Sequence, residues 1–188
     1  MVGTDRDKLP AVFTRAVESL RAAQPRAEVL LTEMAAPQRL APYTFALSAE
    51  VLRAGDEIAS GRLVLLHDPA GQEVWDGTLR IVSYVTAEID AEMAGDPLLA
   101  EVGWSWLMDA LGTHGADHTA AGGTVTQTRS VRFGDLAGPS DTADVELRAS
   151  WTPLDGDLTA HLLAWCELLC SMAGLPPPGV TLLSEAGS

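Results

Sequence analysis

Hydrophobic positions near the start of the chain recur at the spacing of an amphipathic helix. Between residues 9 and 23 the apolar side chains fall at intervals of three and four, and Gln24 and Pro25 follow them. This spacing gathers the apolar side chains on one side of a helix. The residue before a proline disfavours the helical conformation. The pattern therefore predicts a helix over residues 9–23.

The next part of the chain carries strand patterns. Apolar and polar positions alternate over 43–51 with the period of two expected of a half-buried strand. Further apolar runs cover 28–33, 61–67 and 73–89. Residues 68–72 have the Asp, Pro and Gly composition of a tight turn. We predict four strands here, the last two joined as a β-hairpin.

A central helix is predicted over residues 96–111. Asp96 can accept hydrogen bonds from the first turn, and Pro97 suits the first helical position. Gly103 in the helix interior costs about 1 kcal/mol relative to alanine. We therefore expect a backbone or an aromatic ring to pack closely against Gly103. Two apolar stripes on this helix predict two packing partners.

The last part of the chain predicts a second hairpin and a final helix. Residues 124–133 and 142–151 alternate as strands, and a loop rich in Gly, Pro and Asp connects them. Pro153 ends the second of these strands. The final helix, over 158–173, is almost entirely apolar. We expect this helix to be buried on most sides or shared with another subunit.

The predicted order of elements is α-β-β-β-β-α-β-β-α. Consecutive hairpins indicate an antiparallel sheet, and strands that are polar on one side indicate helices packed on the other. We predict a single α+β domain over residues 9–174, with a sheet of about five to six strands and helices mainly on one face. Residues 1–8 are expected to form a flexible N-terminus, and 175–188, with three consecutive prolines, a disordered tail.

Net charge and hydropathy restrict the partners. The formal charge of −14 disfavours direct contact with nucleic acid. No Lys or Arg occurs between Arg80 and Arg129, where seven acids are expected to form one negative face, either solvated or a docking face for a basic partner. No apolar run reaches the roughly 20 residues that cross a bilayer, and no signal segment is visible. We expect a cytoplasmic protein without membrane contact, in which Cys166 and Cys170 are reduced core thiols.

The strongest candidates for chemistry are His114, Asp117 and His118. Two imidazoles and a carboxylate within five residues are ligand types of zinc or iron sites. However, Gly112 and Gly115 indicate that the chain has already left the helix. A polar loop is therefore the main interpretation and a metal-dependent or small-molecule enzyme the alternative. The sequence predicts no metal site and no cofactor.

Two tryptophans of the central helix are candidates for a binding surface. Trp104 and Trp106 each bury a large area and need a partner for the indole N–H. Glu101 and Asp109 lie on the same helix. Packing in the core and packing across a dimer both account for these side chains.

Five short runs resemble an actinobacterial family of proteins of unknown function. They are LLHDP (65–69), DPLL (96–99), VGWSWL (102–107), ASWTP (149–153) and WCELLC (165–170). The resemblance covers residues 10–176 and implies no activity, ligand or catalytic residue. It does imply a gene neighbourhood with a ribonuclease-D-like exonuclease. Separately, the order of elements is similar to the small acidic secretion-chaperone fold, whose dimers hold extended client segments.

The predicted function is that of a non-enzymatic cytoplasmic binding or adaptor protein. We expect a homodimer that holds another protein through a sheet surface or through the acidic face. The alternative is the enzyme that would use His114, Asp117 and His118. A third interpretation is an accessory role in RNA processing through the basic first helix, which requires Arg15, Arg21 and Arg26 on one exposed face.

Overall fold

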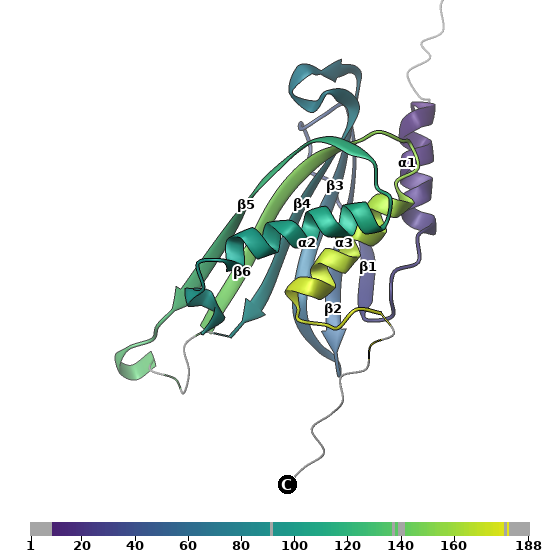
Figure 1. The fold of residues 1–188 in the computed structure, drawn as a ribbon. Coiled ribbons are helices and arrows are strands. Elements are labelled where there is room, and N and C mark those ends of the chain that lie inside the picture. The colour runs from purple at the N-terminus through teal and green to yellow at the C-terminus, as the bar shows by residue number, and fades with distance from the viewer. Residues whose placement is uncertain (1–8, 91, 137, 139–141, 179, 181–188) are drawn as a thin grey trace, which may run out of the picture.

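The structure is a computed structural model, and it describes residues 9–90, 92–136, 138, 142–178 and 180. Figure 1 shows the arrangement of its helices and strands. The helices are α1 (Ala11–Ala22), α2 (Leu99–Thr113) and α3 (Thr159–Met172), with short 3-10 turns η1 (Glu73–Trp75), η2 (Met93–Gly95) and η3 (Gly134–Leu136). The strands are β1 (Val29–Met34), β2 (Tyr43–Arg53), β3 (Asp56–Gln72), β4 (Gly77–Ile89), β5 (His118–Ser130) and β6 (Thr142–Pro153).

The six strands form one antiparallel sheet in the order β1-β2-β3-β4-β6-β5. The α+β class and the order of elements are confirmed. The chain passes through α2 between β4 and β5, and the later strand β6 lies between these two strands in the sheet. This leaves β1 and β5 as the two edges of the sheet.

Helices α2 and α3 cross one face of the sheet in Figure 1. α1 lies on the same side, where the Phe13 ring stands 5.8 Å from Tyr43 and 6.1 Å from His67. Strand residues that point to this side, such as Ile81 and Leu147, are completely buried. In the described part of the chain no helix combines the length and the apolar content needed to cross a bilayer.

The first hairpin turns later than predicted. Residues 68–72 remain within β3, and Gln72 pairs with Gly77 of β4. The chain reverses at η1, after which Asp76 takes a left-handed conformation with φ of 55°. The β3–β4 register shifts between His67 and Gln72. The Asp, Pro and Gly composition therefore marks an irregularity in a long strand, not the reversal itself.

The central helix begins three residues later than predicted. Asp96 Oδ1 accepts a hydrogen bond from the Leu98 amide at 2.9 Å, and the Asp96 carbonyl accepts one from the Leu99 amide at 3.2 Å. The aspartate closes a turn that precedes α2. The helix itself runs from Leu99 to Thr113.

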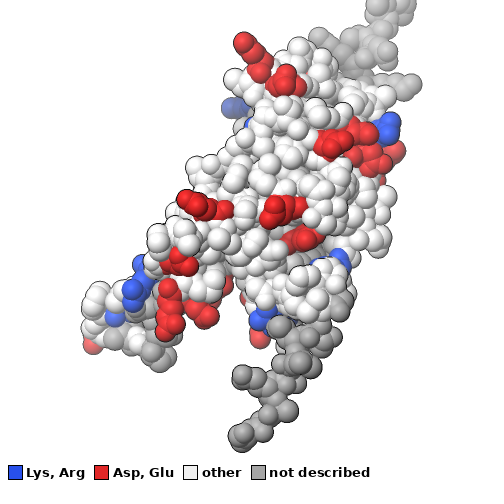
Figure 2. Space-filling model, in the orientation of Figure 1, with Lys and Arg blue, Asp and Glu red and all other residues white. Residues whose placement is uncertain are grey.

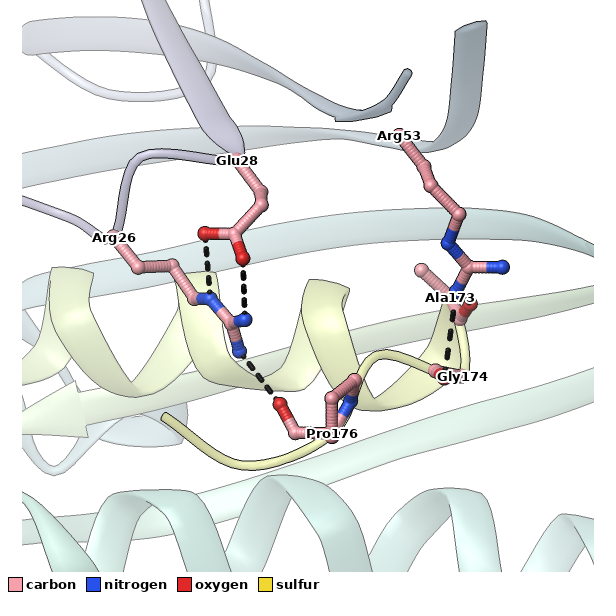
Figure 3. A network of polar contacts seen from close by, with 6 residues as sticks. All are labelled: Arg26, Glu28, Arg53, Ala173, Gly174 and Pro176. Carbon is pink, nitrogen blue, oxygen red and sulfur yellow. Dashed lines mark hydrogen bonds and ion pairs between the residues drawn. The ribbon is translucent and has the colours of Figure 1, made fainter. Parts of the chain in front are cut away.

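Two arginines hold the end of α3 against the sheet (Figure 3). Arg26 donates to both carboxylate oxygens of Glu28 and, through Nη1, to the Pro176 carbonyl at 2.9 Å. Its guanidinium lowers the pKa of Glu28 to about 2. Arg53 donates to the Ala173 carbonyl at 3.3 Å, where a cation is favoured by the unpaired carbonyls of a helix C-terminus.

The predicted flexible termini lie mostly outside the described residues. Of the predicted tail, residues 175–178 and 180 are described, and the Leu175 amide donates to the Cys170 carbonyl at 2.9 Å. Residues 1–8, 179 and 181–188 are not described.

Candidate functional site

The sheet face opposite the helices is the candidate functional site, and we call it the open face. At its centre lie side chains of β3, β4 and β6 that alternate with the core residues. They are Arg62, Val64, Val82, Tyr84 and Arg148. Val82 is 37% exposed, while Val64 and Tyr84 are half-buried. The open face therefore has an apolar centre that no described helix covers.

Two adjoining hollows shape this face. One has a volume of about 430 Å³ and is lined by Val64, Val82 and residues of β5 and β6. The other has a volume of about 530 Å³ and extends over β2 and β3. Arg62, Tyr84 and Arg148 line both hollows. The two hollows thus form one depression across several strands, and it opens to solvent.

Consecutive glycines of β5 form one wall of the first hollow. Gly122 faces open space, with no atom within 4 Å of the position that a Cβ would occupy. A Cβ on Gly123 would instead lie 2.3 Å from the Arg148 carbonyl oxygen and 2.9 Å from the Trp104 ring. Gly123 is therefore required for packing, whereas Gly122 leaves room in the hollow.

Arg80 fixes the strand irregularity beside these glycines. The β5–β6 register shifts between Thr119 and Gly122, and Ala120 within the shift has a φ of 52°. Arg80 donates to the Ala120 carbonyl at 2.8 Å and to Ser150 Oγ at 2.7 Å. Burial lowers the pKa of Arg80. The Arg80 side chain thus links β4 to both β5 and β6 next to Ser150, which lines the first hollow.

Of the two arginines at the centre of the open face, Arg148 is paired with a carboxylate and Arg62, among the described residues, is not. Tyr84 donates its hydroxyl to Glu146 at 2.9 Å, and Arg148 donates to the same carboxylate at 2.7 Å while lying over the Tyr84 ring. Burial and the Glu146 carboxylate raise the pKa of Tyr84. Arg62 makes no hydrogen bond or ion pair within the described part of the chain. Its guanidinium is therefore available to a ligand.

The predicted candidates His114, Asp117 and His118 do not form one ligand set, although His114 and Asp117 line a common hollow of about 490 Å³ beside His161. His114 Nε2 lies 2.5 Å from Glu167 Oε2 on α3, and His118 Nδ1 lies 2.8 Å from the Ala116 carbonyl oxygen. Asp117 is exposed. Among the residues that the structure describes, no group of three or more His, Cys, Asp or Glu side chains could hold a metal ion.

A buried histidine lies near this segment. His161 on α3 accepts a hydrogen bond from Trp151 Nε1 at 3.1 Å on Nδ1, so its proton lies on Nε2. Burial, followed by the nearby His118, lowers the pKa of His161 to about 4. This neutral imidazole supplies the indole partner that a buried tryptophan needs.

The candidate interface residues of α2 fall on different sides of the helix. Trp104 packs towards β5 at Gly123, and Trp106 lines a hollow of about 560 Å³ beside the end of α3. Glu101 and Asp109 are exposed. On the face formed by α2 and α3, Figure 2 shows acidic side chains separated by uncharged surface and not gathered into one patch.

The three arginines of the predicted basic face each lie near a carboxylate. Arg21 donates to both oxygens of Glu33, and Arg26 pairs with Glu28. Arg15 lies 3.8 Å from Asp155. These ion pairs leave little free positive charge at α1.

Together these features define a mixed α+β protein whose single antiparallel sheet carries three helices on one face and an apolar hollow on the other. The chain belongs to the DUF3000 family, described as a protein of unknown function, whose family model matches residues 9–181. No curated protein and no solved structure matches the chain. Membership of a family of unknown function is therefore confirmed.

Proposed function

We propose that the protein is a non-enzymatic binding protein that holds an extended segment of another protein across the open face. The observation that supports this proposal is the uncovered apolar depression around Val64 and Val82. Exposed apolar patches that are rimmed by polar residues are typical of interaction sites.

The form of the depression favours a polypeptide segment. Five neighbouring strands spaced at roughly 4.8 Å span about 19 Å, a distance that about six extended residues cover. The hollows cross β2, β3, β4, β6 and β5 and open to solvent along this path. An extended chain can place alternate side chains into such a depression while its other side chains face water.

Charge suggests the chemistry of the segment. Glu50 and Glu57 also line the second hollow, but Arg62, which borders both hollows beside Arg148, has no carboxylate partner in the described residues. A segment that combines apolar side chains with an acidic one would satisfy the Arg62 guanidinium. We therefore propose an apolar and acidic client segment, in place of the basic partner that an acidic docking face would require.

The other predicted functions gain less support. The enzyme alternative relied on His114, Asp117 and His118. The two histidine side chains contact separate partners, Glu167 and the Ala116 carbonyl, and Asp117 is exposed. The role in RNA processing relied on α1 arginines that are paired with carboxylates. Two buried free thiols suit the reducing cytoplasm that we propose as the compartment, and the actinobacterial origin rests on the sequence resemblance alone.

A peptide array tests the proposal. The probes are labelled peptides of about ten residues, long enough to cross the sheet, that combine Leu, Val or Phe with Asp or Glu. A matched array replaces each acid by Lys. We expect the wild-type protein to bind the acidic array, and Val82→Asp to weaken this binding at least about tenfold because it places a charge on the apolar floor.

Reversal of the charge at residue 62 tests the predicted preference for acidic peptides. Arg62→Glu should weaken binding to the acidic peptides and strengthen binding to the lysine peptides. Val74→Asp serves as the matched control, since Val74 lies at the hairpin tip and is 78% exposed. Equal binding of both arrays by wild type and Arg62→Glu, or no effect of Val82→Asp, would contradict the proposal.

A further inference from the structure

The outer edge of strand β5 presents a second surface, which adjoins the open face at Gly122 and Thr124. β5 is thirteen residues long, and it pairs only with β6 within the described part of the chain. The opposite edge, β1, is six residues long. The outer side of β5 therefore carries the longer row of backbone N–H and C=O groups without a strand partner.

This edge lacks the usual protection against pairing with another chain. Natural edge strands carry Lys, Pro or inward charges, or they are short. β5 contains no Lys, Pro, Asp or Glu, and its one arginine, Arg129, stands next to its end. The register shift near Thr119 disturbs only the first part. From Gly122 to Ser130 the strand stays in regular register with β6.

The regular stretch is suited to pairing with a copy of itself. Two copies of Gly122–Ser130, run antiparallel about a two-fold axis at the central Thr126, place Val125 opposite Gln127 and Thr124 opposite Thr128. Arg129 then faces Gly123, so no like charges lie opposite each other. In a molecule of formal charge −14, this acid-free strand is where a second copy meets little repulsion.

Exposed apolar side chains flank the strand. The start of α2 lies beside β5 in space. Gln127 Nε2 donates to the Asp96 carbonyl at 3.2 Å, and Gly103 packs on Val125. Leu98 and Val102 in this part of α2 are 59% and 40% exposed. Val131 and Phe133, which follow β5 directly, are also exposed. Such side chains can add apolar contact to a backbone ladder.

We propose that two copies of the protein pair antiparallel through β5, about a two-fold axis at Thr126, into one continuous twelve-stranded sheet. The surface is self-complementary, as a two-fold interface requires. This inference stands independently of the client segment proposed for the open face.

Light scattering tests the assembly over about 1–100 µM, a range that spans ordinary dimer affinities. The variant Thr126→Lys/Thr128→Lys places each lysine opposite an acid of β6, Glu146 and Asp144, so the monomer fold gains local partners. Across the two-fold axis the lysine at 126 faces its own copy, and the lysine at 128 lies near it, so the positive charges of the two copies repel each other. We expect a wild-type dimer and at least about a tenfold weaker association in the variant.

Thr32→Lys is the matched control, since Thr32 lies on the opposite edge strand. It should leave the dimer unchanged. A wild-type monomer over the whole range, or a dimer that the double lysine variant does not weaken, would overturn the inference.

A cross-linking experiment decides the question if the lysine variant does not fold. Directly opposed residues in antiparallel strands have Cα atoms about 4.5–5.5 Å apart, within the range of a disulfide. Thr126→Cys should form a covalent dimer under mild oxidation, whereas Thr32→Cys should not. The two native cysteines are buried and do not compete. Equal cross-linking at both positions, or none at residue 126, would overturn the proposal.

Discussion

Two adjacent glycines of β5 have different roles, which single substitutions can separate. Gly123→Ala would place a Cβ 2.3 Å from the Arg148 carbonyl oxygen and 2.9 Å from the Trp104 ring, so strands or α2 must shift. We expect a loss of about 1–3 kcal/mol in the free energy of unfolding. Gly122→Ala meets no atom within 4 Å and should change stability little. Urea unfolding of both variants checks this, and equal stability of the two would contradict the packing role of Gly123.

His161 makes stability depend on pH. Its pKa is about 4 in the folded protein and about 6.5 in an unfolded chain, so the unfolded state binds more protons between these values. Stability is therefore lost as the pH falls through this window. The loss expected from His161 alone is about 2 kcal/mol between pH 7.5 and pH 5.

A matched variant isolates this contribution. His161→Gln retains an acceptor for Trp151 Nε1 but does not titrate. Every other side chain is the same in the two proteins, so the difference in pH dependence between them reports His161. Urea unfolding at several pH values measures it. Identical pH dependence in wild type and variant would contradict the prediction.

Residue chemistry could be predicted only in part from the sequence. The sequence predicted that another group packs closely against Gly103. A Cβ at this position would lie 3.6 Å from Val125, which is an ordinary van der Waals distance. The tight contact lies at Gly123, on another element. Such a contact depends on how α2 crosses β5, which no local pattern encodes. The open face left one visible signal: Val82 and Tyr84 stand among the polar positions of β4.

At the scale of elements, α2 can be stabilised at its internal glycine. A Cβ on Gly103 would make an ordinary van der Waals contact with Val125, and alanine favours the helix over glycine. We expect Gly103→Ala to raise the free energy of unfolding by roughly 0.5–1 kcal/mol. Urea unfolding measures this change. A fall in stability would show that α2 and β5 approach each other too closely for one methyl group.

Periodicity predicted the three helices and six strands that the structure describes. Most of them bury one side against the same core, whereas β5 has no buried residue. The ends of the elements were less predictable, because residues that favour turns do not always lie where a helix or strand begins or ends. Asp96 closes a turn before α2, and residues 68–72 disturb β3 without reversing the chain. The position of β6 between β4 and β5 was not predictable, because hairpin signals do not give the order of strands in a sheet.

At the scale of the whole molecule, the two proposed surfaces use different groups. The open face offers side chains normal to the sheet, whereas the edge of β5 offers backbone groups in its plane. The surfaces adjoin at Gly122 and Thr124, which line the first hollow. A dimer formed through β5 would therefore place two open faces side by side and leave both accessible.

This geometry predicts that one substitution separates binding from assembly. Val82 lies on β4, two strands from the edge, so Val82→Asp should weaken peptide binding at least about tenfold and leave the dimer intact. Peptide binding and light scattering on the same preparation measure both properties. If Val82→Asp instead yields a monomer, the second copy covers the open face itself. The depression would then be the dimer interface. Neither the peptide site on the open face nor the dimer edge at β5 would stand.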